Sequence, residues 1–188
     1  LQPVLDEPQL RLLCHEGEFQ PLLGELVLHK LDAVLSDRPA PPNPALKTTS
    51  QLLGTSALAW YAPAPWAAAA RQNFPLSLAQ VPLLLPTEHA AVRARINHWL
   101  EREHIRPRIA GEFEDSALLS TFAASGMGVM PAPLLLQTHL HTTCALELVG
   151  TTPDVHEEFH LIYSERKVMH PLLVRLLAIA VDESLLNS

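Results

Sequence analysis

The alternation of short apolar runs with amphipathic helical segments is the feature that most constrains how this chain can fold. Between residues 18 and 30, apolar side chains recur every three or four positions, which predicts a helix with one buried face. Apolar runs of strand length flank it at residues 10–14 and 31–36, and we expect them to form a parallel strand pair around the helix. Repeated units of this kind predict α/β layers around parallel sheets.

The rest of the chain continues the alternation. Further strands are expected at residues 46–53, 57–62, 81–85, 108–112, 128–130, 145–149 and 159–164. Further helices are expected at residues 88–103, with Thr87 as N-cap; between Asp115 as N-cap and Gly126; and at residues 170–180. Proline-rich loops, one of them around Pro63 and Pro65, separate two clusters of such units, which suggests two lobes.

Composition excludes several classes of protein. With 188 residues and 48% hydrophobic content, the chain can bury a core, and its net charge of -7 has the wrong sign for binding the phosphates of nucleic acid. No apolar run reaches the roughly 20 residues that span a bilayer, so we expect no membrane contact. Cys14 and Cys144 are too few for a disulfide framework, and residues 1–7 lack the features of a signal peptide. We therefore expect a cytoplasmic protein.

One motif suggests a protease. Residues 154–160, DVHEEFH, hold His156, Glu157 and His160 in the H-E-x-x-H pattern of zinc proteases, where a helix places both histidines on one metal ion. Here Pro153 precedes the motif, and the residues that follow are aromatic, β-branched or apolar, as in a strand. Strand positions four apart are separated by about 13 Å, so these histidines cannot share an ion. We favour a strand edge with solvated acidic side chains.

Other patterns of chemical groups are also incomplete. His139, His141 and Cys144 are metal-ligating types within six residues, but a structural zinc site needs four ligands at recognisable spacings. The Gly126-x-Gly128 pattern follows a helix, whereas a phosphate loop follows a strand and precedes a helix. We predict no enzyme, no metal and no cofactor; a metal enzyme built on the histidines is the alternative.

Three stretches together resemble one family. They are residues 100–135, LEREHIRPRIAGEFEDSALLSTFAASGMGVMPAPLL; residues 29–39, HKLDAVLSDRP; and residues 159–177, FHLIYSERKVMHPLLVRLL. Their order resembles that of the LysR-type transcriptional regulators. The resemblance implies a type-2 periplasmic-binding-protein-like α/β fold, in which two lobes joined by two crossover strands face an effector cleft.

The resemblance also implies the domain organisation. The first lobe would comprise residues 1–55 plus 160–188, and the second lobe residues 56–159. The N-terminal winged helix-turn-helix of the family is absent from this chain, and so is the first strand of its effector domain. DNA would therefore be contacted only through that absent domain, and HEEFH would lie on the second crossover strand.

The carboxyl ends of the strands predict where an effector binds, because ligands of open α/β lobes gather there. The candidate residues at these ends are Glu16, Glu18, Ser36, Asp37, Thr87, Glu88, Phe113, Glu114 and Asp115. Their carboxylates are hard oxygen ligands, which favour a small cation such as sodium over an anion. The alternative is that Thr87 and Asp115 only cap helices, Asp37 only turns the chain, and the glutamates are solvated.

Within the family, HKLDAVLSDRP, GEFEDSALL and HEEFHLIYSERKVMHP are most similar to activators of sodium/proton antiporter genes. The resemblance implies an effector domain that responds to sodium or to alkaline pH, and ten histidines offer groups that titrate in the relevant range. It also implies a homodimer, in which residues 10–14 face the partner's helix of residues 115–124. The alternative from another class is a solute-binding protein of the same fold that serves a transporter.

Overall fold

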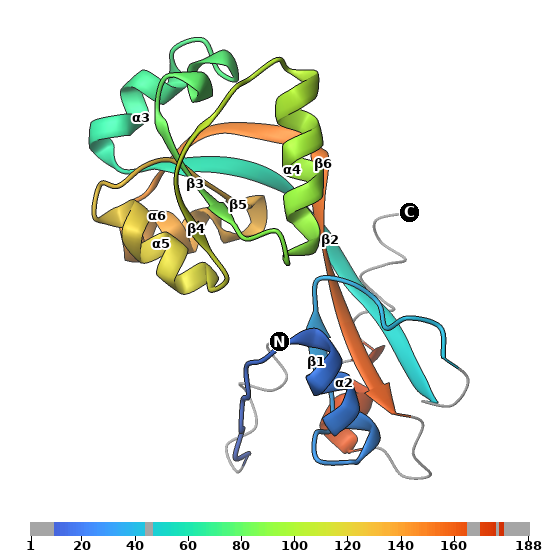
Figure 1. Cartoon of the computed structure of the whole chain (residues 1–188). Coiled ribbons are helices and arrows are strands. Elements are labelled where there is room, and N and C mark those ends of the chain that lie inside the picture. The colour runs from blue at the N-terminus through green and yellow to red at the C-terminus, as the bar shows by residue number, and fades with distance from the viewer. Residues whose placement is uncertain (1–9, 44–46, 165–169, 176, 179–188) are drawn as a thin grey trace. The chain divides into compact units, whose positions relative to one another are not determined.

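The chain forms two compact units in a computed structural model that describes residues 10–43, 47–164, 170–175 and 177–178 (Figure 1). The first unit is Leu1–Gly54 with Glu158–Ser188, and the second is Thr55–Glu157. The prediction about residues 1–7 lies outside the described residues. Within the described ranges, no helix has the length and apolar character needed to cross a bilayer.

In the first unit, helix α2 (Phe19–Val27) packs against strand β1 (Val34–Ser36). Leu23 and Leu26 are buried on the inner face of α2, and their cluster includes Val34 and Ile162. The predicted helix is therefore confirmed, although it ends three residues early. Strand β1 pairs antiparallel with strand β6 (Glu147–Ser164), so the prediction of a parallel partner at residues 10–14 is wrong.

Residues 10–18 have no regular secondary structure. Leu12 and Leu13 are 63% and 71% exposed, so the apolar run on which the strand prediction rested is not buried. A strand requires a neighbour that accepts and donates its backbone hydrogen bonds, and no described residue pairs with this segment. Its apolar character alone was not sufficient to make it a strand.

Two long strands contribute residues to both units. Strand β2 (Thr48–Ala62) runs unbroken through Gly54, where separate strands at 46–53 and 57–62 were expected. Strand β6 likewise runs through Pro153 and joins the runs expected at 145–149 and 159–164. The four-stranded sheet has the order β1-β6-β2-β5, so β2 and β6 are hydrogen-bonded neighbours. A Cβ added at Gly54 would have no atom within 4 Å, and the φ angle of Gly54 is not in the positive range that a glycine turn uses. Gly54 therefore continues the strand.

The second unit contains the parallel strand pair that the sequence predicts. Strand β3 (Pro82–Pro86) pairs with strand β4 (Arg108–Phe113), and helix α4 (Ala91–Arg102) connects them. Helix α5 (Ser116–Ala124) follows, and strand β5 (Met130–Pro133) pairs antiparallel with β2. The predicted stripe on α4 is confirmed, because Val92, Ile96, Trp99 and Leu100 are all buried.

Three details of the second unit differ from expectation. The proline-rich segment after Ala62 is helix α3 (Ala64–Arg71), because proline in the first turn lacks only an N–H that would have no helical partner. Helix α4 begins at Ala91 with Ala90 as N-cap, so Thr87 does not cap it. The histidine-rich segment forms helix α6 (Gln137–Cys144), which follows the short 3₁₀ helix η2 (Leu134–Leu136). A second short 3₁₀ helix, η1 (Leu76–Ala79), precedes β3.

Strand β2 separates two cores in the second unit. Leu58, Trp60 and Ala62 belong to one buried cluster, and the alternate residues Ala59 and Tyr61 belong to another. Because successive strand residues point to opposite faces, both faces of this segment are covered, which explains its uninterrupted apolar sequence. In the first cluster the rings of Trp60 and Phe74 lie 5.8 and 6.3 Å from that of Trp99.

Gly128 is required where β3 meets the segment leading into β5. A Cβ at this position would lie 2.5 Å from the carbonyl oxygen of Pro82, which accepts a hydrogen bond from the Val129 N–H at 2.8 Å. We expect Gly128→Ala to destabilise the protein by about 1–3 kcal/mol, because the backbone must move. Gly24→Ala on the exposed side of α2, where nothing lies within 4 Å, is the control and should stabilise by about 0.5–1 kcal/mol. Equal urea midpoints for the two variants would contradict this packing.

The burial of the Tyr61 hydroxyl predicts that alkaline pH lowers the stability of the fold. Its hydroxyl is buried and has no hydrogen-bond partner among the described residues, and burial raises the pKa of Tyr61 to about 12. The unfolded state loses this proton near pH 10 and the native state does not, so stability should fall on the order of 1 kcal/mol as pH rises from about 10 to about 12. Tyr61→Phe should show a shallower decline in thermal denaturation, with little change at neutral pH. Parallel pH profiles would show that Tyr61 ionises freely in the native state.

Candidate functional site

The carboxyl ends of β3 and β4 lie side by side in the second unit. The Thr87 N–H donates a hydrogen bond to the Phe113 carbonyl at 3.0 Å, immediately beyond the paired strands. Parallel strands end at the same edge of a sheet, so this bond joins the segment containing Glu88 to the one containing Glu114 and Asp115. The structure therefore brings together all five candidate residues that the sequence placed in this lobe.

Two of these five residues also support the local structure. Asp115 is the N-cap of α5, and its Oδ1 accepts a hydrogen bond from the Leu118 N–H at 2.6 Å. The ring of Phe113 packs 5.1 Å from that of Phe122, beside the second core. The cap prediction for Asp115 is confirmed, and its second carboxylate oxygen is not used by that cap. Glu114 is exposed.

Arg93 is the residue that sequence reasoning missed. Its side chain is 4% exposed, yet its guanidinium lies 2.5 Å from Glu112 Oε1 and 3.1 Å from Glu88 Oε1. It also donates to the Pro86 carbonyl and to Asn97 Oδ1. A buried guanidinium is stable only when its charge and its donors are matched in this way. Arg93 thus ties the first turn of α4 to the ends of both strands.

The position of Arg93 in the sequence carried a usable signal. It lies three residues before Ile96 and seven before Leu100, so it shares the apolar face of α4. A charged residue at such a position is buried and needs a partner. Glu88 follows the strand that precedes the helix, and Glu112 lies near the end of the strand that succeeds it. The prediction of solvated or metal-ligating glutamates did not include this ion pair.

The first-unit candidates lie around the start of α2 and the end of β1. Ser36 and Asp37 both contact Arg38: Ser36 Oγ accepts from its N–H at 3.3 Å, and Asp37 Oδ1 accepts from its Nε at 3.1 Å. The Arg38 guanidinium also lies 5.1 Å from the ring centre of Phe19, the first residue of α2. Glu18 is the N-cap of α2, without a side-chain cap, and Glu16 is exposed just before it.

The zinc-protease motif lies on strand β6, as the sequence analysis favoured. His156 and His160 are therefore strand residues, and His160 Nε2 lies 2.8 Å from Glu158 Oε2. His139 lies on α6, where its Nδ1 is 3.4 Å from Thr143 Oγ1. Among the described residues, no three histidine, cysteine or acidic side chains are grouped so that they could hold a metal ion.

Comparisons with known proteins agree with this fold. The family model described as LysR substrate binding domain matches residues 5–184. The transcriptional activator protein NhaR of Escherichia coli strain K12 is 27% identical over 173 residues, which are 92% of this chain and 56% of NhaR. This chain therefore spans about half the length of that relative.

Solved structures show the same arrangement. The regulatory domain of HypT from Salmonella typhimurium, in its apo form, superposes with a TM-score of 0.72 at 15% identity, over 96% of this chain and 88% of that one. The effector-binding domain of QuiR in complex with shikimate has a TM-score of 0.58 at 13% identity, over 89% of this chain and 78% of that one. The predicted type-2 periplasmic-binding-protein-like α/β fold is thereby confirmed.

Removal of Arg93 should weaken this edge of the sheet. We expect Arg93→Met to lower the free energy of unfolding by about 2 kcal/mol, because Glu88 and Glu112 lose their shared cation while both stay partly hydrated. Glu88→Gln should cost less than about 1 kcal/mol, since its side chain is 67% exposed. Urea denaturation measures both variants. Equal losses would mean that Arg93 does not organise the site.

Proposed function

The chain belongs to the LysR family of transcriptional regulators as an effector-binding domain, and from this premise we propose that it senses sodium ions or alkaline pH for an activator of sodium/proton antiporter genes. The identity to NhaR and the phrases HKLDAVLSDRP and GEFEDSALL support this assignment. Domains of this family bind small effectors, as the QuiR complex with shikimate illustrates for that protein. The effector of this chain would act in the cytoplasm, where the regulated DNA lies.

The observation that carries the proposal is the hydrogen bond between Thr87 and Phe113. It lies next to the exposed carboxylate of Glu114 and the cap residue Asp115, at the edge where β3 and β4 end. Carboxylate and carbonyl oxygens are the ligands that hard cations prefer. Because Arg93 already occupies Glu88 and Glu112, the cation ligands proposed from this unit are Glu114 and Asp115.

The corresponding ligands proposed from the first unit are Ser36 and Asp37, with Glu16 and Glu18 as acidic neighbours. The Asp37 carboxylate binds Arg38 through Oδ1, and the exposed fractions of the Arg38 and Asp37 side chains are 43% and 27%. Such an exposed pair contributes little stability, so a cation can replace the guanidinium at small cost. We propose that sodium binding favours one conformation of the domain and thereby changes the state of the attached DNA-binding domains.

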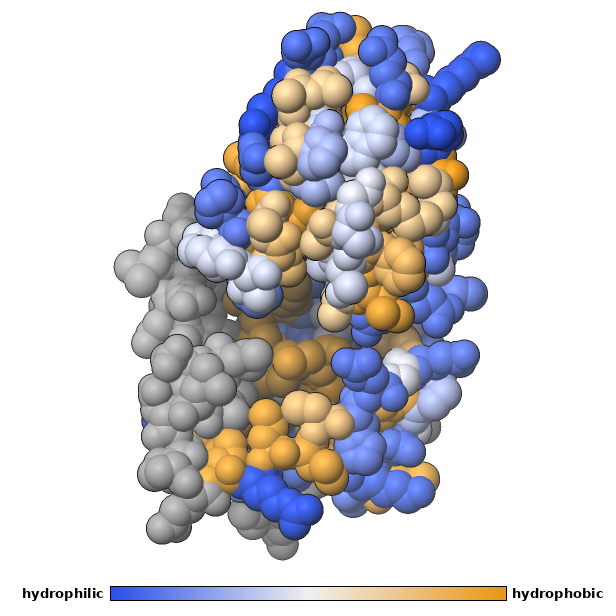
Figure 2. Space-filling model, turned by 90° about the vertical axis from the view of Figure 1, so that its left-hand side faces the viewer, coloured by the Kyte–Doolittle hydropathy of each residue, from blue (hydrophilic) through white to orange (hydrophobic). Residues whose placement is uncertain are grey.

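We also propose that the full-length regulator is a homodimer. Large apolar side chains remain exposed on α5, where Leu118 is 54% and Phe122 43% exposed, and on the segment of Leu12 and Leu13. Figure 2 shows apolar side chains between polar ones on one face of the molecule. Apolar surface that a single copy leaves exposed supports an interface in which residues 10–14 of one subunit cover α5 of another.

Sodium binding should raise thermal stability selectively. We expect the unfolding midpoint to increase with NaCl and not with KCl at equal ionic strength, because a ligand that binds only the native state stabilises it. Each kcal/mol corresponds to about 2–4 °C for a chain of this size. The measurement is differential scanning calorimetry at neutral and at alkaline pH.

Amide substitutions of the proposed ligands test whether sodium binds at these residues. Asp37→Asn and Glu114→Gln should each reduce the sodium-specific increase at least severalfold, whereas Glu101→Gln, an exposed acid on α4, should retain it. Identical midpoints in the two salts would contradict sodium as a direct effector. An increase that persists in both site variants would contradict these ligands.

A further inference from the structure

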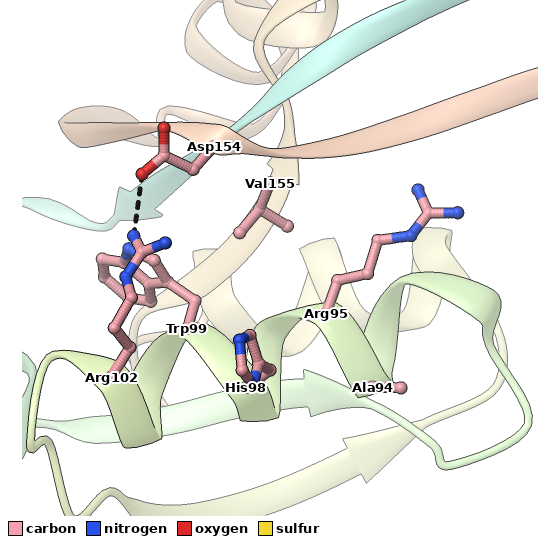
Figure 3. Close-up of a pocket in the computed structure, with 7 residues that line it drawn as sticks. All are labelled: Ala94, Arg95, His98, Trp99, Arg102, Asp154 and Val155. Carbon is pink, nitrogen blue, oxygen red and sulfur yellow. Dashed lines mark hydrogen bonds and ion pairs between the residues drawn. The ribbon is translucent and has the colours of Figure 1, made fainter.

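A cavity lies within the second unit, and none of its lining residues is among those at the carboxyl ends of β3 and β4. It is a surface pocket of about 340 Å³ between helix α4 and strand β6, lined by Ala94, Arg95, His98, Trp99, Arg102, Asp154 and Val155 (Figure 3). Small-molecule sites have volumes from about 300 Å³ upward, so the pocket is large enough for a compact ligand. None of its residues belongs to the proposed sodium site.

The charged side chains around the pocket are predominantly basic. Positions 95, 98 and 102 recur at three- and four-residue steps, so one face of α4 presents two guanidiniums and an imidazole. Figure 3 shows Arg95 and Arg102 reaching from α4 on either side of Val155. Asp154 is the single acidic residue of the lining, and its Oδ2 lies 2.8 Å from Arg102 Nη2. The lining therefore keeps a net positive charge at neutral pH.

Both guanidiniums hold β6 against α4, and that of Arg102 still has the capacity to bind a ligand. Arg95 donates to the His156 carbonyl of β6, and Arg102 donates through Nε to Glu103 at 3.2 Å and through Nη2 to Asp154. A guanidinium has five N–H donors, and these contacts use two of those on Arg102. Asp154 is 64% exposed, so the pair is hydrated and can be exchanged for another carboxylate.

The base of the pocket is apolar and rigid. Trp99 is 5% exposed and is held between the rings of Trp60 and Phe74, while Val155 is 4% exposed. Ala94 adds a small side chain that leaves space above the helix. A flat apolar group can therefore lie against a surface that does not need to rearrange, which lowers the entropic cost of binding.

We propose that this pocket binds a small organic anion, with its carboxylate paired to Arg102 at one end, its flat apolar body over Trp99 and Val155, and Arg95 at the other end. Bidentate contact between guanidinium and carboxylate gives such a site its selectivity for anions. Strand β6 continues into the first unit through Glu158, so a ligand held on Asp154 and Val155 contacts a strand that both units share. The site is thus a second regulatory input, independent of the sodium site.

Titration with potassium 2-naphthoate tests this site. We expect saturable one-to-one binding by isothermal titration calorimetry, accompanied by a change in tryptophan fluorescence, and no comparable binding of the uncharged 2-naphthamide. The affinity should fall with increasing potassium chloride, since ion pairing is screened by salt. Equal binding of the amide, or no saturation with naphthoate, would overturn the proposal.

Charge variants test the individual roles. Arg102→Gln should weaken naphthoate binding about tenfold, because it removes the charge-assisted hydrogen bonds to the carboxylate. Arg95→Gln should weaken binding less, because it removes only a more distant positive charge. Arg102→Lys should retain part of the affinity, and Arg106→Gln, which removes an exposed cation outside the pocket, should bind like the parent protein. Unchanged affinity in Arg102→Gln would overturn the assignment.

Asp154→Asn should raise the affinity for naphthoate, whereas the arginine variants lower it. The bound carboxylate competes with Asp154 for Arg102, so this variant should bind naphthoate more tightly than the parent. Weaker binding would show that Asp154 shapes the pocket and does not compete with the ligand. Circular dichroism establishes that each variant is folded, and the response to sodium should be unaltered in all of them, which separates this test from that of the proposed function.

Discussion

The pairing of two long strands, β2 and β6, is the constraint on which the rest of the structure depends. Each contributes residues to both compact units, and they are neighbours in one sheet. In the second unit, alternate side chains of β2 enter two different cores, so displacing this strand would disrupt both. In the first unit, β6 is the strand on which β1 pairs. The remaining elements are assembled on this pair, and both candidate ligand sites lie on elements that it supports.

The carboxyl edge of β3 and β4 depends on a second interaction, the burial of Arg93. Parallel strands bring acidic loops together, and an uncompensated cluster of carboxylates would oppose folding. One guanidinium bound to two glutamates offsets part of that negative charge and fixes the first turn of α4. It also separates the acids into two groups, because Glu88 and Glu112 are engaged whereas Glu114 is exposed. An effector at this edge therefore encounters a site whose charge is partly balanced.

Periodicity was sufficient to predict most elements of the second unit. The stripe of α4, the strands β3 and β4 and the Asp115 cap follow from local pattern, because each is determined by its own side chains. Patterns could not show that Gly54 and Pro153 lie inside strands, since both residues also suit turns. Nor could they show that residues 10–14 have no partner strand in the part of the chain that the structure describes, because pairing is a property of the whole sheet. The Arg93 ion pair required knowing that Glu88 and Glu112 reach one helix.

The continuity of β2 and β6 is tested most directly by backbone ¹³C chemical shifts in solution. Secondary shifts report extended or helical conformation at each residue without requiring a ligand or a partner. The structure predicts extended values at every residue of 54–56 and of 156–160, within the strands Thr48–Ala62 and Glu147–Ser164. Turn values at Gly54, or helical values from His156 to His160, would contradict the two shared strands and the placement of both sites.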